Sequence, residues 1–133
     1  MQTDTTVGFI SQNHDKLADI KSRPHHKPFI KVLNRSMMLR VPNKYKKEFR
    51  RSKKTTFIIN NQALRISREK TNSQILRDIS WHYSTSANKA NKNFNRAFCE
   101  QNADIIIENI DGLKELSASR LIKLNNYRKR KLR

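Results

Sequence analysis

The stretch TTFIINNQALRI, residues 55–66, contains two apolar runs on either side of Asn60 and Asn61. Asparagine tolerates the positive φ angles that a tight hairpin turn requires. Runs rich in β-branched and aromatic residues around such a pair are typical of two paired strands. The stretch therefore predicts a β-hairpin, and the rest of the chain can be placed around it.

The segment before this hairpin also has the composition of strands. PFIKVLN (28–34) and MMLRV (37–41) flank a short polar stretch, residues 34–36, that suits a turn, so a second hairpin is predicted. Further upstream, NHDKLADIKS (13–22) predicts one short helix with Asn13 as its cap.

A basic insert, NKYKKEFRRSKK (43–54), separates the two predicted hairpins, and Glu48 is its only acid. Tyr45 and Phe49 stand four residues apart, so they can anchor a solvated loop or a short helix. The density of positive charge favours a patch that contacts phosphates. Its members are Lys44, Lys46, Lys47, Arg50, Arg51, Lys53 and Lys54.

Helices are expected from residue 70 onward. SQILRDISWHY (73–83) has apolar residues at helical spacing after Thr71 or Ser73 as a cap, and ADIIIENI (103–110) and residues 117–130 predict further helices. The expected fold class is α+β, with an N-terminal β-hairpin region followed by a helical C-terminal half. The expected segments are an irregular part (1–28), a β-hairpin region (29–68) with the insert 43–54, a helical nucleic-acid-binding region (69–127) and a basic tail (128–133).

The stretch STSANKANKNFNRAF, residues 84–98, contains no acid, and its alanines and phenylalanines form an apolar stripe if it is a helix. Residues 73–98 then resemble part of a helix-turn-helix, although Ser84 occupies the turn and Thr85 an apolar position. The resemblance implies a second helix that reads base edges in the major groove. An ordinary solvated helix face is the alternative. The side chains on that face would be Asn88, Lys89, Asn91, Lys92, Asn95 and Arg96.

Trp81, His82 and Tyr83 are consecutive. We expect Trp81 and Tyr83 to pack inside and His82 to face solvent. Stacking of the aromatic rings on unpaired bases is the alternative.

The charge becomes negative between residues 100 and 115. Glu100, Asp104 and Glu108 are four residues apart and would share one helix face. We expect that face to be solvated or to pair with the basic segments of the protein. Acid–base or metal chemistry by paired carboxylates is the alternative.

A second local resemblance covers residues 103–124. Ile110, Gly112, Leu113, Ala118 and Leu121 match the helix-hairpin-helix element of DNA repair and uptake proteins, while Lys114 replaces its second glycine. The resemblance implies that backbone N–H groups hold a DNA phosphate, with the charge of Lys114 nearby. In the alternative interpretation, Gly112 simply ends a helix.

The formal net charge of the 133-residue chain is +18, from 29 Lys and Arg against 11 Asp and Glu. Such an excess repels itself unless a polyanion neutralises it, so nucleic acid is the expected partner, ahead of an anionic membrane surface. No apolar run approaches the length of about 18 residues that a membrane helix needs. Without a secretory signal, a cytoplasmic, nucleoid-associated location is expected.

Patterns for catalysis and metal binding are missing from the sequence. Cys99 is the only cysteine, which suits a reducing compartment and a small core position beside Phe98. The four histidines and Cys99 show no metal-ligand spacing, and two glycines cannot form a glycine-rich phosphate loop. We therefore expect no metal, no cofactor and no enzymatic activity.

The sequence thus predicts a DNA-binding transcriptional regulator or nucleoid-type protein that uses the basic insert for phosphates and residues 87–98 for groove contacts. Duplex DNA is the expected partner, a homodimer would let two copies use half-sites, and no membrane partner is expected. An RNA-binding component of a ribosome or other ribonucleoprotein is the alternative. A small basic nuclease, with His25 or His82 beside an acid, is the second alternative. The basic tail completes the phosphate contacts with Arg128, Lys129, Arg130, Lys131 and Arg133.

Overall fold

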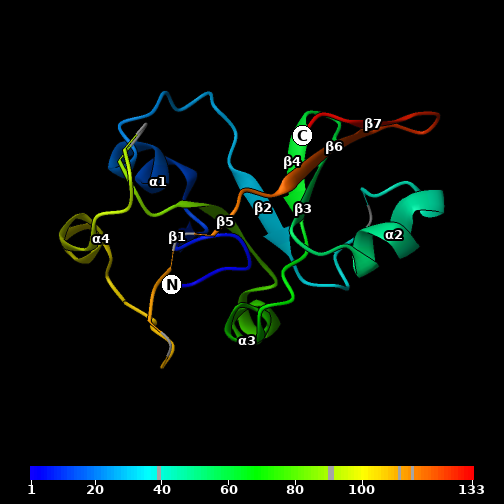
Figure 1. Cartoon of the computed structure of the whole chain (residues 1–133). Coiled ribbons are helices and arrows are strands. Elements are labelled where there is room, and N and C mark those ends of the chain that lie inside the picture. Colours follow the sequence, from blue (N-terminus) through cyan, green and yellow to red (C-terminus); the bar gives the residue numbers. More distant parts are fainter. Residues whose placement is uncertain (39, 90–91, 111, 115) are drawn as a thin grey trace.

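The computed structural model describes residues 1–38, 40–89, 92–110, 112–114 and 116–133, and a seven-stranded sheet runs through the whole chain (Figure 1). The strands are β1 (Gly8–Ser11), β2 (Ile30–Leu33), β3 (Thr55–Ile59), β4 (Gln62–Arg65), β5 (Trp81–Ser86), β6 (Arg120–Leu124) and β7 (Lys129–Lys131). The helices are α1 (His14–Ile20), the 3-10 turn η1 (Asn43–Tyr45), α2 (Lys46–Arg51), α3 (Lys70–Ile79) and α4 (Arg96–Asn102). None of the described helices is long and apolar enough to cross a membrane.

The sheet is mixed, in the order β1-β5-β2-β4-β3-β6-β7. β2 is parallel to β4 and β3 is parallel to β6, whereas the other neighbouring pairs are antiparallel. Strands distant in sequence therefore lie side by side, since β5 separates β1 from β2.

The hairpin predicted at residues 55–66 is confirmed as β3 and β4, paired antiparallel with Ile59 opposite Gln62. Asn60 and Asn61 have φ angles of 49° and 60°. Positive φ at both central residues is the conformation of a tight two-residue hairpin turn. The hairpin lies in the middle of the sheet because β2 pairs with β4 and β6 pairs with β3.

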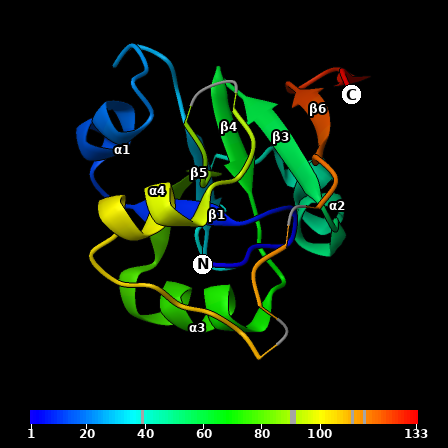
Figure 2. The same cartoon turned by 60° about the vertical axis from the view of Figure 1, so that its left-hand side comes forward.

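Two apolar clusters cover the two ends of the sheet. Phe49 of α2 packs at one end against Phe57 and other core residues. Leu17 of α1 and Cys99 of α4 pack at the other end, near β1 and β5. Figures 1 and 2 show α1 and α4 at this second end, α2 at the opposite end, and α3 along a further side of the sheet.

Two short helices of the sequence prediction are confirmed. Asn13 caps α1 by accepting a hydrogen bond from the Lys16 N–H at 3.0 Å. The basic insert forms η1 and α2, which Phe49 anchors with 0% of its surface exposed.

The first helix expected after residue 70 is confirmed as α3, but the expectation of a helical C-terminal half is wrong. Trp81–Ser86 forms β5, and residues 120–124 and 129–131 form β6 and β7 instead of a last helix. In β6, buried Ile122 and Leu124 alternate with more exposed neighbours, and the helix-like spacing of the leucines masked this two-residue period. The fold class is therefore α/β with one mixed sheet, not α+β.

Both local resemblances are also wrong. The second helix of the supposed helix-turn-helix is absent, because β5 is followed by irregular residues among those described until α4 begins at Arg96. Residues 103–110 form no helix, so the helix-hairpin-helix element is absent as well. The second predicted hairpin fails too, because the described residues after Leu33 form a turn and no strand until β3.

Candidate functional site

A half-hidden cluster forms where the C-terminal end of α1 meets the end of β5. The Nζ atom of Lys21, whose residue is 5% exposed, donates hydrogen bonds to Ser86 O at 2.9 Å and to Asn88 Oδ1 at 2.6 Å. It also donates to the backbone carbonyl of Asn88. Burial, and secondarily the charge of Arg23, lowers the pKa of Lys21 to about 8. The lysine therefore ties two distant segments together and keeps a cation in a poorly solvated position.

Arg23 supplies a second cation at the same place. Its guanidinium lies 4.7 Å from the centre of the Phe29 ring, and its Nη2 donates to Pro28 O at 3.0 Å. Its Nε atom is buried and has no hydrogen-bond partner among the described residues. Buried donors are almost always paired, so this N–H group lacks an acceptor that a ligand could supply.

The polar segment that follows β5 completes the cluster of Lys21 and Arg23. Ser86 Oγ donates to Asn88 Oδ1 at 2.6 Å, and Asn88 Oδ1 also accepts from the ammonium of Lys21. Neither cation forms an ion pair with a carboxylate in the described part of the chain. Cations and hydroxyl and amide groups in this combination suit an anionic, hydrogen-bonding ligand.

A buried polar network lies further along the sheet. Arg65 of β4 donates to Thr56 Oγ1 from Nε at 3.1 Å and to Thr5 Oγ1 from Nη1 at 3.0 Å. Thr56 Oγ1 is also 3.0 Å from Ser119 Oγ. A weak contact of 3.5 Å joins Arg65 to Asp4. This network attaches both the N-terminal loop and the approach to β6 to the centre of the sheet.

Gly8 allows the N-terminal loop to lie close to β5. A Cβ atom at this position would lie 3.0 Å from Thr3 Cγ2 and 3.1 Å from the Thr85 carbonyl oxygen. A larger residue would push the loop, and with it Thr5, away from Arg65.

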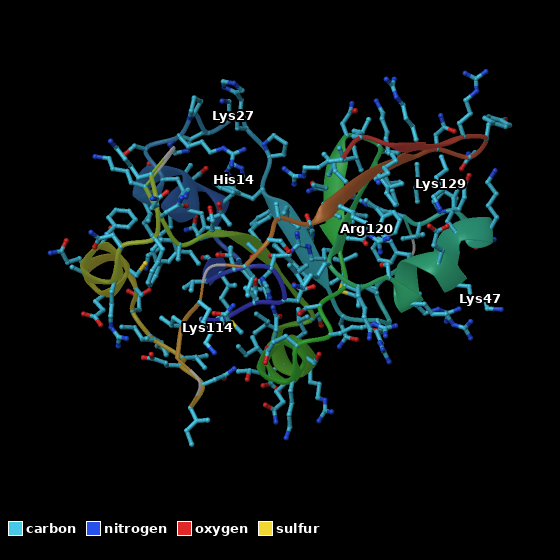
Figure 3. The ribbon with its side chains drawn as sticks, in the orientation of Figure 1. His14, Lys27, Lys47, Lys114, Arg120 and Lys129 are labelled. Atoms are coloured by element: carbon cyan, nitrogen blue, oxygen red, sulfur yellow. The ribbon has the colours of Figure 1, made fainter. Side chains whose placement is uncertain are left out.

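The loop after α1 is held by its own ion pairs. His25 contacts Asp15 at 3.0 Å and Asp19 at 3.1 Å, and the hydrogen bond with Asp15 raises the pKa of His25. Figure 3 shows Lys27 on this loop, extending away from the sheet. Within the described residues, no three His, Cys, Asp or Glu side chains gather in a way that could hold a metal ion.

An apolar cavity of about 380 Å³ lies beside the Lys21 cluster, between α1, β1, α4 and the irregular segment that follows α4. Leu17, Phe9 and Ile105 contribute to its walls. The acidic residues at its rim pair with basic residues of the protein, as expected, but Asp104 and Glu108 lie outside α4 and share no helix face with Glu100. Asp104 contacts Lys16 at 2.6 Å, and that hydrogen bond lowers the pKa of the carboxyl group.

The residues expected to read DNA have other surroundings. Asn95 caps α4 by accepting from the Phe98 N–H at 2.9 Å, and Arg96 pairs with Glu100 at 2.7 Å and Glu108 at 2.9 Å. Asn88 belongs to the Lys21 cluster. Lys89 and Lys92 are exposed in the irregular segment, and Asn91 lies outside the described residues.

The other predicted phosphate contacts lie at the opposite end of the sheet, except Lys114, which lies near the N-terminal loop (Figure 3). Lys129 of β7 pairs with Glu48 of α2, and Lys44 lies 4.9 Å from the centre of the Tyr45 ring. Arg128, Arg130 and Lys131 are exposed, as are Lys47, Arg50, Arg51, Lys53 and Lys54, whereas Lys46 is half-buried. Arg133 Nε donates to Ser119 O at 3.0 Å, and the backbone N–H of Lys114 donates to Gln2 Oε1 at 2.8 Å.

Two predictions about single side chains have opposite outcomes. His82 is 0% exposed and its Nε2 lies 2.9 Å from Asn72 Oδ1, so the expectation that it faces solvent is wrong. Cys99 is buried in the same apolar cluster as Leu17, as predicted.

Sequence reasoning missed Lys21, Arg23 and Arg65. These three are among 29 Lys and Arg of the chain, and nothing in the sequence around them distinguishes them from the others. The alternation of residues 81–86 was a usable signal, because it fits a strand that carries the serines better than a helix cap.

Comparison with known proteins gives a fold but no sequence family. No family model and no curated protein sequence matches the chain. A solved structure of a double-substituted variant of Sua5 from P. abyssi superimposes with a TM-score of 0.70 over 98% of this chain, at 14% sequence identity. The chain spans about half of that protein, since the match covers 50% of it.

This match overturns the main functional expectation. The chain has the fold of Sua5 and not that of a helix-turn-helix protein, so the expectations of a DNA-binding transcriptional regulator of that type and of no enzymatic activity are contradicted. The chain therefore shares its fold with P. abyssi Sua5 along almost its whole length.

Proposed function

We propose that this chain is an adenylate-forming enzyme domain of the threonylcarbamoyl-AMP synthase type, which supplies an intermediate for tRNA modification. The fold supports this class, because the YrdC-like domain of Sua5 has that activity and acts on ATP and threonine. The observation that carries the proposal is the convergence of Lys21, Arg23 and Asn88 where the end of α1 meets the end of β5, at which neither cation pairs with a carboxylate of the described residues.

The product, threonylcarbamoyl-AMP, determines which bonds the enzyme must form and break. The amine of threonine must first add to carbon dioxide and lose a proton, which gives a carbamate. A carbamate oxygen then attacks the α-phosphorus of ATP and the bond to the β-phosphate oxygen breaks, so that pyrophosphate leaves. Both steps gather negative charge, and fixed cations stabilise such charge most strongly where water is excluded.

The cluster is suited to that task. The charge of the Lys21 ammonium would attract phosphate or carbamate oxygens, the Nε–H of Arg23 would donate to them, and Ser86 and Asn88 would orient the ligand by hydrogen bonds. Because Lys21 already binds Asn88, a substrate would meet a positioned cation and not a mobile one.

The test measures pyrophosphate release from ATP, with and without threonine and bicarbonate, by the purified chain. We expect release that needs both co-substrates, and ATP binding by calorimetry. Lys21→Met and Arg23→Gln should each lower the rate by about 100-fold, the order found when one charge-stabilising donor is removed.

Lys123→Met is the matched control, because this lysine of β6 is exposed and far from the cluster in sequence. Its rate should equal that of the unmodified chain. The proposal fails if the folded protein neither binds ATP nor releases pyrophosphate, or if all three variants react at the same rate.

A further inference from the structure

We infer that a continuous arginine-rich groove between α2, the turn after β2 and α3 is a docking surface for RNA. Two hollows make up the groove, of about 350 Å³ and 470 Å³, and Arg35 and Arg68 line both of them. Lys47, Arg50 and Arg51 complete the first hollow, and Arg77 lines the second. This groove contains none of the residues of the proposed catalytic cluster.

The lining of the groove contains no carboxylate among the described residues. Three acids are adjacent in sequence to these cations; Asp78 is exposed outside the lining, and the other two are engaged elsewhere. Glu48 pairs with Lys129, and Glu69 caps α3 by accepting from Thr71 N–H at 3.0 Å and Asn72 N–H at 2.6 Å. The positive charge is therefore not neutralised within the described part of the chain, and an external anion has to balance it.

The scaffold holds these cations in place. Phe49 fixes α2 to the core, and Arg68 Nη2 donates to Arg50 O at 2.8 Å, which joins the segment after β4 to the end of α2. Asn34 Nδ2 donates to Leu76 O at 3.0 Å, which holds the turn that carries Arg35 against α3. The groove thus needs little rearrangement to bind an extended anion.

Its chemistry favours a phosphate backbone with unpaired bases. Five of the six cations are arginines, whose planar forks bind phosphate oxygens in pairs and stack on exposed bases. Asn34, Ser67 and Ser73 add hydrogen-bonding groups. A flat lipid surface cannot enter a concave groove, whereas a loop or single strand of RNA can follow it.

The first experiment is a titration of the full chain into a fluorescent tRNA transcript and into single-stranded RNA of about 20 nucleotides, between about 0.05 and 0.2 M salt. Arg35→Ala/Arg68→Ala should weaken binding about tenfold. It should also reduce the slope of log affinity against log salt by about 1.4, since each neutralised phosphate of a single strand contributes about 0.7 to that slope.

Because Arg68 also joins two elements, Lys47→Ala/Arg51→Ala is a second variant that leaves that hydrogen bond intact. It should show the same decrease in affinity and slope. Lys27→Ala/Lys123→Ala is the matched control, with the same change of charge on exposed residues outside the groove, and should weaken binding far less.

The inference is overturned if the control weakens binding as much as the groove variants do, or if vesicles with anionic lipid bind in a groove-dependent way and RNA does not. Pyrophosphate release is measured on the same variants. Because the groove and the catalytic cluster share no residue, retained release with abolished RNA binding supports the groove, and the failure of either proposal is seen separately.

Discussion

At the scale of single residues, burial decides what the cations of this chain do. Lys21 and Arg65 each lie 5% exposed, and both have several hydrogen-bond acceptors around them. Exposed lysines such as Lys53 are fully hydrated, so they add positive charge to the surface but contribute little to stability. A lysine in poor contact with water releases its proton more easily, which is why burial lowers the pKa of Lys21 to about 8.

The pKa of Lys21 makes a prediction about stability and pH. Its value of about 8 in the folded chain lies below the ordinary value of 10.5, so between these values the unfolded chain binds more protons. The contribution of this group to the free energy of unfolding therefore rises as pH increases through about 8.

Urea unfolding at about pH 7 and about pH 9.5 checks this prediction. The unmodified chain should gain stability over Lys21→Met with rising pH. Lys21→Arg should show no such gain, because a guanidinium stays charged at both values. Parallel pH profiles of all three proteins would contradict the assignment.

At the scale of elements, the ends of the helices explain residues that looked functional. Asn95 has the amide that could bind adenine, but that amide caps α4. Glu69 caps α3 in the same way, so neither Thr71 nor Ser73 is the cap. Hydrogen bonding at a helix start satisfies N–H groups that have no partner within the helix.

The cap of α4 gives the second prediction. Asn95→Ala should lower the free energy of unfolding by about 1 kcal/mol, because the Phe98 N–H is left without its acceptor. Asn95→Asp should keep most of the stability, and urea unfolding of both variants measures the difference. RNA affinity should be unchanged in Asn95→Ala, so weaker binding at unchanged stability would show that the amide contacts nucleic acid after all.

At the scale of the whole molecule, net charge opposes folding. With a formal charge of +18 on 133 residues, repulsion between cations acts throughout the surface. The described ion pairs mostly join exposed side chains, which contribute little each. Added salt should therefore weaken the repulsion among the excess cations more than it weakens the attraction within the ion pairs.

The third prediction follows from this balance. The midpoint of thermal unfolding should rise when sodium chloride increases from about 0.02 to about 0.3 M, which shortens the Debye length to less than about 10 Å. Scanning calorimetry checks it. Lys123→Gln/Arg130→Gln, which removes two exposed charges, should show a smaller rise. A midpoint that falls with salt would mean that the ion pairs outweigh the repulsion.

Local features of this protein follow from its sequence alone. Asn60 and Asn61 form the turn at the centre of the sheet, Asn13 begins α1, and Phe49 anchors the basic helix, because each depends on neighbours a few residues away. The excess of positive charge is equally evident in the sequence, and it still favours a polyanionic partner.

The remaining features depend on the tertiary structure. Leu121 and Leu124 have a spacing that fits a helix, yet parallel pairing with β3, more than sixty residues away, makes them part of a strand. His82 of β5 is buried, and its ring contacts Asn72 of α3, ten residues earlier in the chain. The Lys21 cluster and the arginine groove both bring together segments that are far apart in sequence, and local patterns carry no information about such contacts because strand pairing and burial depend on the whole chain.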